Sequence, residues 1–230
     1  MTTFRRREVA RRIFATEFNK ATHKLQDDEE RSPVYVLTPL GLRCNRVFVV
    51  GALLEKEEVR PDSGIWRIRV SDPTGVFLGF VGRYQPEALE SLLEIEPPEL
   101  VAIAAKVRVF EGDRTMVFLR PESIAVVTSD VRDYWVVETA KATIGRIENF
   151  EKGDDDDVKL ARQIYSVDLN EYRNAVKQAL LTIMESFVEP EEIEEEIEEG
   201  ETEEEEIEDL DLEFEFEEEE WDLSDLLKEE

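Results

Sequence analysis

The sequence predicts a mainly β fold class with α-helices. We expect a five-stranded barrel flanked by an N-terminal helix and C-terminal helices, followed by a disordered acidic tail. Apolar and polar residues alternate through the middle of the chain, which is typical of half-buried strands. The period becomes helical on either side of that region. The last 42 residues, 189–230, hold 26 of the 57 acidic side chains.

These changes of pattern divide the chain into four segments. Residues 1–33 form an N-terminal helix and linker, 34–128 the barrel domain, 129–188 a helical region and 189–230 the tail. The tail carries a net charge of −25, and the remaining residues together carry −4. A run this acidic buries too little apolar surface to offset the entropy of ordering, so we expect it to be disordered.

An amphipathic helix is predicted over residues 4–25, where apolar side chains recur every three to five positions. Arginines surround its start, at Arg5, Arg6, Arg7, Arg11 and Arg12. This basic cluster fits a contact with phosphate or with the acidic tail. It also fits the solvated face of a helix that docks on the barrel.

Five strands and one helix are expected next, in the order strand, strand, strand, helix, strand, strand. The strands are predicted at 46–59, 65–70, 76–82, 100–110 and 115–128, and the helix at 85–99. Gly51 inside the first strand indicates a bulge or a sharp bend, as at a barrel corner. This element order is that of the OB-fold, a Greek-key barrel with a helix between its third and fourth strands.

Two helices are predicted after residue 150, a short one near 157–165 and a longer one over 168–187. The acidic run before the short helix is better explained by capping of the helix start than by a cation site. Asp168 is the expected N-cap of the longer helix. With no strand pattern left, this region must pack on the barrel or on another protein.

The sequence carries no recognisable catalytic constellation, and we expect a protein that is not an enzyme and uses no cofactor. His23 and Cys44 are the only His and Cys, too few for a structural zinc site, so no metal is expected. No membrane span or signal-peptide core is present. A single cysteine suits a reducing interior, so a cytoplasmic, nucleoid-associated location is expected.

The outer surface of the barrel carries the candidate nucleic-acid-binding residues. OB-folds bind oligonucleotides on strands two and three and the adjoining loops, using cations and aromatic faces. The alternation points outward Arg67, Arg69, Phe80, Lys106, Arg108 and Phe110, with Arg114 in the adjoining turn. Two alternatives stay open. The terminal helices could cover Phe80 and Phe110, and a one-residue register shift would exchange the two faces.

Five long segments within residues 4–148 carry a family resemblance: PVYVLTPLGLRCNRVFVVGALLE, VSDPTGVFLGFVGRYQPEAL, EPPELVAIAAKVRVFE, VFLRPESI and RDYWVVETAKATIGRI. They resemble the archaeal OB-fold proteins associated with replication protein A (RPA). The resemblance implies a role beside RPA on single-stranded DNA (ssDNA) in replication and repair. It also implies that Phe80 and Phe110 match base-stacking positions, late in strand three and near the strand four–five loop.

The layout, a barrel followed by helices, is similar to that of the middle subunit of the eukaryotic complex, which assembles through a helix after its barrel. This fold-level analogy assigns the apolar stripe of the last helix to partner binding, namely Leu169, Tyr172, Val176, Ile183 and Phe187. The expected partner is the RPA large subunit.

Two functions follow. The first is a non-enzymatic accessory protein of archaeal RPA that binds ssDNA weakly or jointly with an RPA subunit. A net charge of −4 outside the tail argues against tight binding alone, because phosphate neutralisation supplies much of the affinity. The alternative is a protein-only adaptor that binds RPA and recruits partners through its acidic tail without contacting DNA.

The tail ends in two patterns. Residues 209–217 alternate, with Phe214 and Phe216 on one face and carboxylates on the other, and we expect them to compete with DNA for the barrel. Residues 221–227 are predicted to form a short helix with a hydrophobic staple between Trp221 and Leu226, beside Leu227. We expect this helix to dock a replication or repair enzyme. The simpler alternative is a tail that serves solubility alone.

Overall fold

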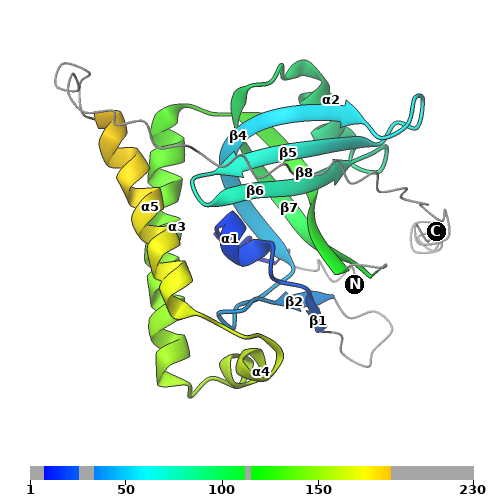
Figure 1. The fold of residues 1–230 in the computed structure, drawn as a ribbon. Coiled ribbons are helices and arrows are strands. Elements are labelled where there is room, and N and C mark those ends of the chain that lie inside the picture. Colours follow the sequence, from blue (N-terminus) through cyan, green and yellow to red (C-terminus); the bar gives the residue numbers. More distant parts are fainter. Residues whose placement is uncertain (1–7, 26–33, 112–114, 188–230) are drawn as a thin grey trace, which may run out of the picture. The chain divides into compact units, whose positions relative to one another are not determined.

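The computed structural model describes residues 8–25, 34–111 and 115–187. These belong to one unit, Met1–Glu189, while the second unit, Pro190–Glu230, lies outside the described residues. The elements (Figure 1) are α1 (Ala15–Phe18), β1 (His23–Leu25), β2 (Tyr35–Leu37), β3 (Arg43–Cys44), β4 (Arg46–Glu58), β5 (Trp66–Asp72), β6 (Gly75–Val81), α2 (Pro86–Glu94), β7 (Glu99–Glu111), β8 (Thr115–Val126), α3 (Ser129–Lys152), α4 (Asp156–Ile164) and α5 (Leu169–Phe187).

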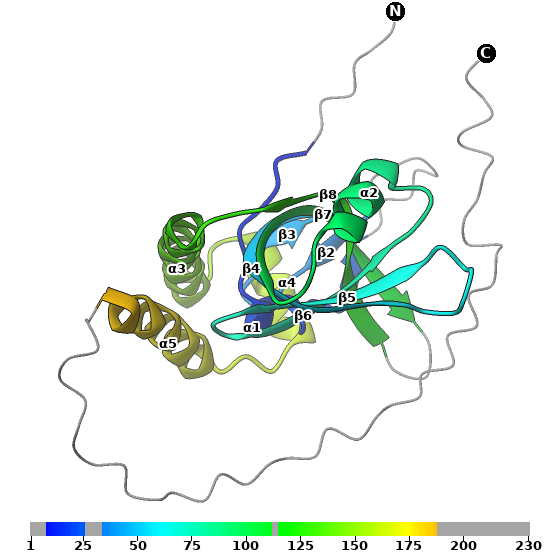
Figure 2. The same cartoon turned by 90° about the horizontal axis from the view of Figure 1, so that it is seen from above.

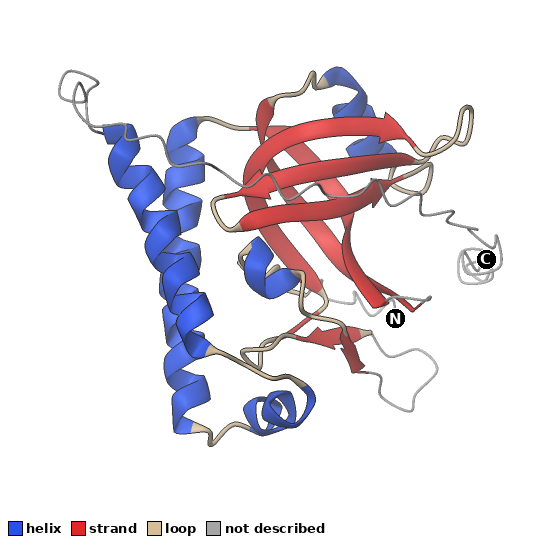
Figure 3. Ribbon diagram, viewed as in Figure 1, coloured by secondary structure: helices blue, strands red, loops and turns tan. Residues whose placement is uncertain are grey.

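Five strands close into a barrel in the order β4-β5-β6-β8-β7, with β7 returning to β4 (Figure 3). Neighbouring strands are antiparallel except β6 and β8, which pair in parallel. With α2 between the third and fourth barrel strands, this is the OB-fold topology. The predicted fold class is confirmed.

The first barrel strand changes its pairing partner near Gly51, where the sequence predicted a bulge or a sharp bend. Its first half pairs with β7 and its second half with β5, with a register shift between Leu53 and Glu55. A Cβ atom on Gly51 would lie 2.2 Å from the carbonyl oxygen of Ser71. Glycine therefore allows the backbones of β4 and β5 to approach closely enough for the barrel to close.

The core fills the barrel and continues to its outside beneath α1 and α3. The fully buried side chains inside the barrel come from alternating strand positions, including Ile68, Val70, Phe77, Ile103 and Leu119. Pro86 lies in the first turn of α2, and the helix adds Ala88 and Leu92 to the same core.

The predicted helix over residues 4–25 is wrong in extent, because the N-terminal helix is the single turn α1. The described residues before it, 8–14, are not helical, and Arg11 forms a parallel bridge with Val47 of β4. The backbone of Arg11 donates to Arg46 and accepts from Phe48, both at 2.9 Å. Because an isolated helix is only marginally stable in water, these tertiary contacts with β4 override the helical period.

The chain also forms a second, small sheet, which was not predicted. It has three strands in the order β1-β2-β3, with two or three residues in each. Strands this short show too few alternations to be recognised from a sequence. Val36 and Cys44 pair across β2 and β3 and are both buried in the main core.

Helices α3 and α5 lie side by side along one side of the barrel (Figures 1 and 2). Trp135 of α3 is buried, donates its indole N–H to the carbonyl of Phe48 at 2.9 Å, and meets the ring of Phe14 edge to face. Asp155 caps α4 as the sequence predicted, accepting from the backbone N–H of Asp157. No helix in the described ranges has the length and hydropathy of a membrane span.

Candidate nucleic-acid interface

The outward side chains of adjacent barrel strands form the candidate interface. Ile68 and Val70 of β5 and Val107 of β7 point into the core. The residues that alternate with them along each strand therefore point outward. The outward faces expected from the alternation in β5 and β7 agree with the burial of these side chains. The predicted residues that this alternation turns outward are Arg67, Arg69, Lys106 and Arg108.

Arg67 and Arg69 lie opposite carboxylates on β4. Arg67 pairs in register with Glu57 and forms an ion pair with it at 2.6 Å, and Arg69 does the same with Glu55 at 3.4 Å. All four side chains stay about 40–50% exposed, so each pair contributes little to stability. Each of these two arginines is therefore already paired with a carboxylate on the neighbouring strand.

Phe80 is outward-facing but covered. It lies opposite Arg67 in the register of β5 and β6, on the face away from Phe77 and Val81. Its side chain is only 6% exposed, and its ring meets that of Phe118 edge to face at 5.2 Å. The ring that contacts it comes from β8. Phe118 is partly exposed and presents the aromatic surface at this position.

Lys106 and Arg108 belong to a cationic cluster on β4, β7 and β8. Lys106 pairs in register with Arg46 on one side and with Arg120 on the other. Glu122 forms an ion pair with Arg46. Partial burial lowers the pKa of Lys106, and the positive charges of Arg108, Arg120 and Arg46 act in the same direction, while Glu122 opposes them.

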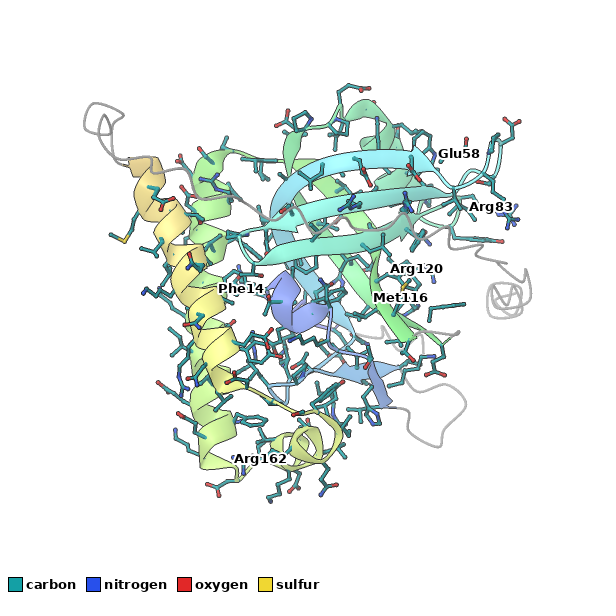
Figure 4. All side chains as sticks on the ribbon, in the orientation of Figure 1. Phe14, Glu58, Arg83, Met116, Arg120 and Arg162 are labelled. Atoms are coloured by element: carbon teal, nitrogen blue, oxygen red, sulfur yellow. The ribbon has the colours of Figure 1, made fainter. Side chains whose placement is uncertain are left out.

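Phe110 lies at the far end of β7, where it pairs in register with Met116 and is partly buried. Met116 and Arg120, both labelled beside β8 in Figure 4, lie two positions before and two positions after Phe118 on the same strand. Arg114 in the β7–β8 turn lies outside the described residues.

The sequence prediction missed Phe118, Arg120 and Arg46. The signal for the first two was available, because Val117 and Leu119 alternate with them in the strand and are buried. Arg46 stands at the start of β4, where the alternation begins, so its face could be assigned only from its pairing with Lys106.

A second surface is the groove between α3 and α5, with a volume of about 620 Å³. Its apolar lining comes from Ile144, Ile147, Val176, Leu180, Leu181 and Met184, and its charged lining from Glu148, Glu151, Arg173 and Lys177. Ile144 and Met184 are exposed. The groove therefore offers apolar surface to solvent between two helices.

The predicted partner-binding stripe of α5 needs a correction. Tyr172, Val176 and Ile183 are buried against the chain's own core, and Leu169 packs in the same cluster as Tyr172. The helical period identified a buried face correctly, but this face is covered by the same chain. The side chain of Phe187 and the tail residues Phe214, Phe216, Trp221, Leu226 and Leu227 lie outside the described residues.

The remaining titratable groups in the described ranges do not assemble a second site of recognisable chemistry. No group of three or more His, Cys, Asp or Glu side chains there is placed to hold a metal ion. Cys44 is buried, which raises the pKa of its thiol to about 12.

No protein-family model and no curated protein matches the chain. Among solved structures it is similar to a replication protein A heterotrimer bound to ssDNA, with 11% identity and a TM-score of 0.43, over 60% of this chain and 98% of that chain. It is also similar to the second single-stranded DNA binding protein of Mycobacterium smegmatis, with 13% identity and a TM-score of 0.32, over 38% of this chain and 90% of that chain. A third similar structure is that of the mitochondrial single-stranded DNA binding protein Rim1 of S. cerevisiae, with 24% identity and a TM-score of 0.30, over 36% of this chain and 94% of that chain.

Proposed function

We propose that this chain is a non-enzymatic OB-fold accessory protein of archaeal RPA that binds ssDNA weakly or jointly with an RPA subunit, in replication and repair. The observation that carries the proposal is the outer barrel face, where cations and aromatic rings alternate over β5, β6, β7 and β8. Single-strand binding needs this combination, because cations track the phosphates and rings stack on the bases. A cytoplasmic, nucleoid-associated location follows from the proposal.

Weak or shared binding fits the charges on this face. Glu55 and Glu57 already neutralise Arg69 and Arg67, and residues 1–188 carry a net charge of −4. Affinity for a single strand depends on the number of phosphates that cations neutralise. A partner that adds its own cations would then complete the site.

The test is a gel shift with labelled ssDNA, on the chain alone and mixed with the RPA large subunit. We expect Phe118→Ala, and separately Arg67→Ala/Arg69→Ala, to weaken binding. Phe80→Ala is less informative because the buried ring also supports the fold. The matched control removes two exposed lysines from α3 and α4, Lys141→Ala/Lys159→Ala. Wild-type binding in both test variants would rule out this face.

The groove between α3 and α5 is our candidate for the contact with the RPA large subunit. Its exposed apolar lining suits an amphipathic helix laid between two helices. We expect Ile144→Asp/Met184→Asp to abolish co-purification of the two proteins, because a charge in the groove opposes apolar burial. Leu93→Asp, at an exposed position on α2, is the control and should leave co-purification intact. Retained co-purification of the groove variant would exclude the groove.

The alternative function is a protein-only adaptor, and the burial of Phe80 together with the Arg67 and Arg69 ion pairs favours it. Photo-crosslinking to a labelled oligonucleotide, with and without the RPA large subunit, separates the two functions. Label on this chain in either state supports DNA binding. A lack of label in both states, with co-purification intact, supports the adaptor.

We also propose roles for the tail, which lies outside the described residues. Residues 209–217 would compete with DNA for the barrel face, and residues 221–227 would recruit a replication or repair enzyme. Deleting 189–230 should then strengthen ssDNA binding at low salt, and Trp221→Ala should abolish recruitment alone. Unchanged DNA affinity after the deletion would exclude the competition but not the recruitment.

A further inference from the structure

Three cations face one another in a row across three neighbouring barrel strands. Arg46 of β4 pairs in register with Lys106 of β7, and Lys106 pairs with Arg120 of β8. Adjacent strands lie about 4.8 Å apart. Arg108 stands two residues along β7 on the same face, about 7 Å from Lys106 by strand geometry. We call Arg46, Lys106, Arg108 and Arg120 the cation row.

Such a row is unfavourable in the free protein, because like charges placed directly opposite each other destabilise a sheet. Lys106 and Arg108 both have lowered pKa values, caused first by partial burial and next by a neighbouring guanidinium. The carboxylate that offsets these charges is Glu122, and it already forms an ion pair with Arg46. Within the described residues, neither Lys106 nor Arg108 forms an ion pair.

The contrast with β5 locates the excess charge. Arg67 and Arg69 each have a carboxylate on β4, at 2.6 and 3.4 Å. In the cation row, Lys106 and Arg108 have no such carboxylate among the described residues, and the nearby Glu122 is already paired with Arg46. A polyanion gains little net charge neutralisation on β5, but it relieves the repulsion within the row.

We propose that the cation row is the phosphate-binding half of the interface, so that the backbone of the single strand lies on β4, β7 and β8, beside Phe118, and not along β5 and β6. This inference rests on the ssDNA ligand of the proposed function. It differs from the strand-two and strand-three location expected of OB-folds. Arg67 and Arg69 then orient the strand more than they attract it.

The test compares two variants that each remove two positive charges, Lys106→Ala/Arg108→Ala and Arg67→Ala/Arg69→Ala. The probe is a fluorescent oligothymidylate of about 16 nucleotides, the upper site size of one OB-fold. The measurement is the slope of log K against log salt, on the full chain with the RPA large subunit. Each cation that no longer neutralises a phosphate of a single strand lowers the slope by about 0.7, so we expect a decrease of about 1.4 in the row variant.

In the Arg67→Ala/Arg69→Ala variant we expect the slope of log K against log salt to decrease by less than half as much as in the Lys106→Ala/Arg108→Ala variant. An equal or larger decrease there would overturn the cation row and leave the proposed function intact. Absence of oligothymidylate binding by the wild type would instead refute the proposed function. If the wild type binds a synthetic peptide of residues 209–217 through Lys106 and Arg108 but not the oligonucleotide, the row is an acidic-peptide site, and the phosphate assignment is wrong.

Discussion

Arg146 of α3 holds the carboxylate of Glu17 in α1, with Nη2 at 2.7 Å and Nε at 3.1 Å from the same oxygen, Oε2. The other oxygen accepts from the hydroxyl of Thr38 at 2.7 Å. Glu17 is 1% exposed, so this pair is buried and both oxygens of its carboxylate accept hydrogen bonds. It connects the N-terminal turn to the first long helix after the barrel.

Arg146→Met should therefore destabilise the fold by about 3–5 kcal/mol, because it leaves the Glu17 carboxylate buried without its partner. The measurement is the free energy of unfolding in urea. The double variant Glu17→Gln/Arg146→Met leaves no unpaired charge and should recover most of that stability. Equal destabilisation in the single and double variants would contradict this role of the ion pair.

Asp72 connects the β5–β6 turn to α1. Its Oδ2 accepts from the backbone N–H of Ala15 at 2.8 Å, and its Oδ1 accepts from the N–H and the hydroxyl of Thr74. Asp72→Ala leaves buried backbone donors without an acceptor and should cost about 2–4 kcal/mol in urea unfolding. Thr74→Val removes one hydroxyl and should cost about 1 kcal/mol. The Thr74 hydroxyl also accepts from the backbone N–H of Thr16 in α1 at 3.2 Å, so greater destabilisation in the threonine variant would show that Thr74, and not Asp72, makes the main connection to α1.

Gly51 and Gly145 give opposite predictions for the same substitution. A Cβ on Gly51 would lie 2.2 Å from a backbone oxygen, so Gly51→Ala must open the barrel corner and should be strongly destabilising. Gly145 lies exposed within α3, and a Cβ there would meet nothing within 4 Å. Gly145→Ala should stabilise by about 0.5–1 kcal/mol. Melting temperatures of both variants check the pair, and a neutral Gly51→Ala would contradict the close approach.

The barrel could be predicted because each strand carries enough alternations to define its faces, and Gly51 and the β5–β6 turn mark where the chain bends. The N-terminal helix could not, because the same apolar spacing is satisfied by an extended segment paired with β4. The α5 stripe shows a related limit. Periodicity identified Tyr172 as buried, but whether its neighbour is α3 or a partner is a tertiary fact.

Only part of the candidate interface could be predicted from the sequence. The outward residues of β5 and β7 follow from period two. The burial of Phe80 does not, since it depends on the distance between β6 and β8, which are separated in the chain by α2 and β7. The pairing of Arg46 with Lys106 likewise arises only when the barrel closes.

Cys44 provides a probe of how the small sheet packs against the core. Its burial raises the pKa of the thiol to about 12, and the thiolate is the reactive form. We expect no reaction with a disulfide reagent at about pH 8 in the native protein, and stoichiometric reaction in urea, where the pKa returns to about 8.5. Rapid native labelling would contradict the packing of β3 against the core.

Lys106 should make DNA binding pH-dependent. Burial and the neighbouring arginines lower its pKa in the free protein, and a phosphate beside it favours the ammonium form and raises that pKa on binding. The affinity for DNA is therefore highest at a pH where Lys106 is already protonated in the free protein. It decreases as the pH rises above the lowered pKa of Lys106 in the free protein. Between that pKa and the higher pKa in the complex, binding takes up a proton. Calorimetric titration in buffers of different ionisation enthalpy measures this uptake. Lys106→Arg keeps the charge throughout and should abolish the uptake at similar affinity, whereas an unchanged pH profile in that variant would exclude Lys106 as its source.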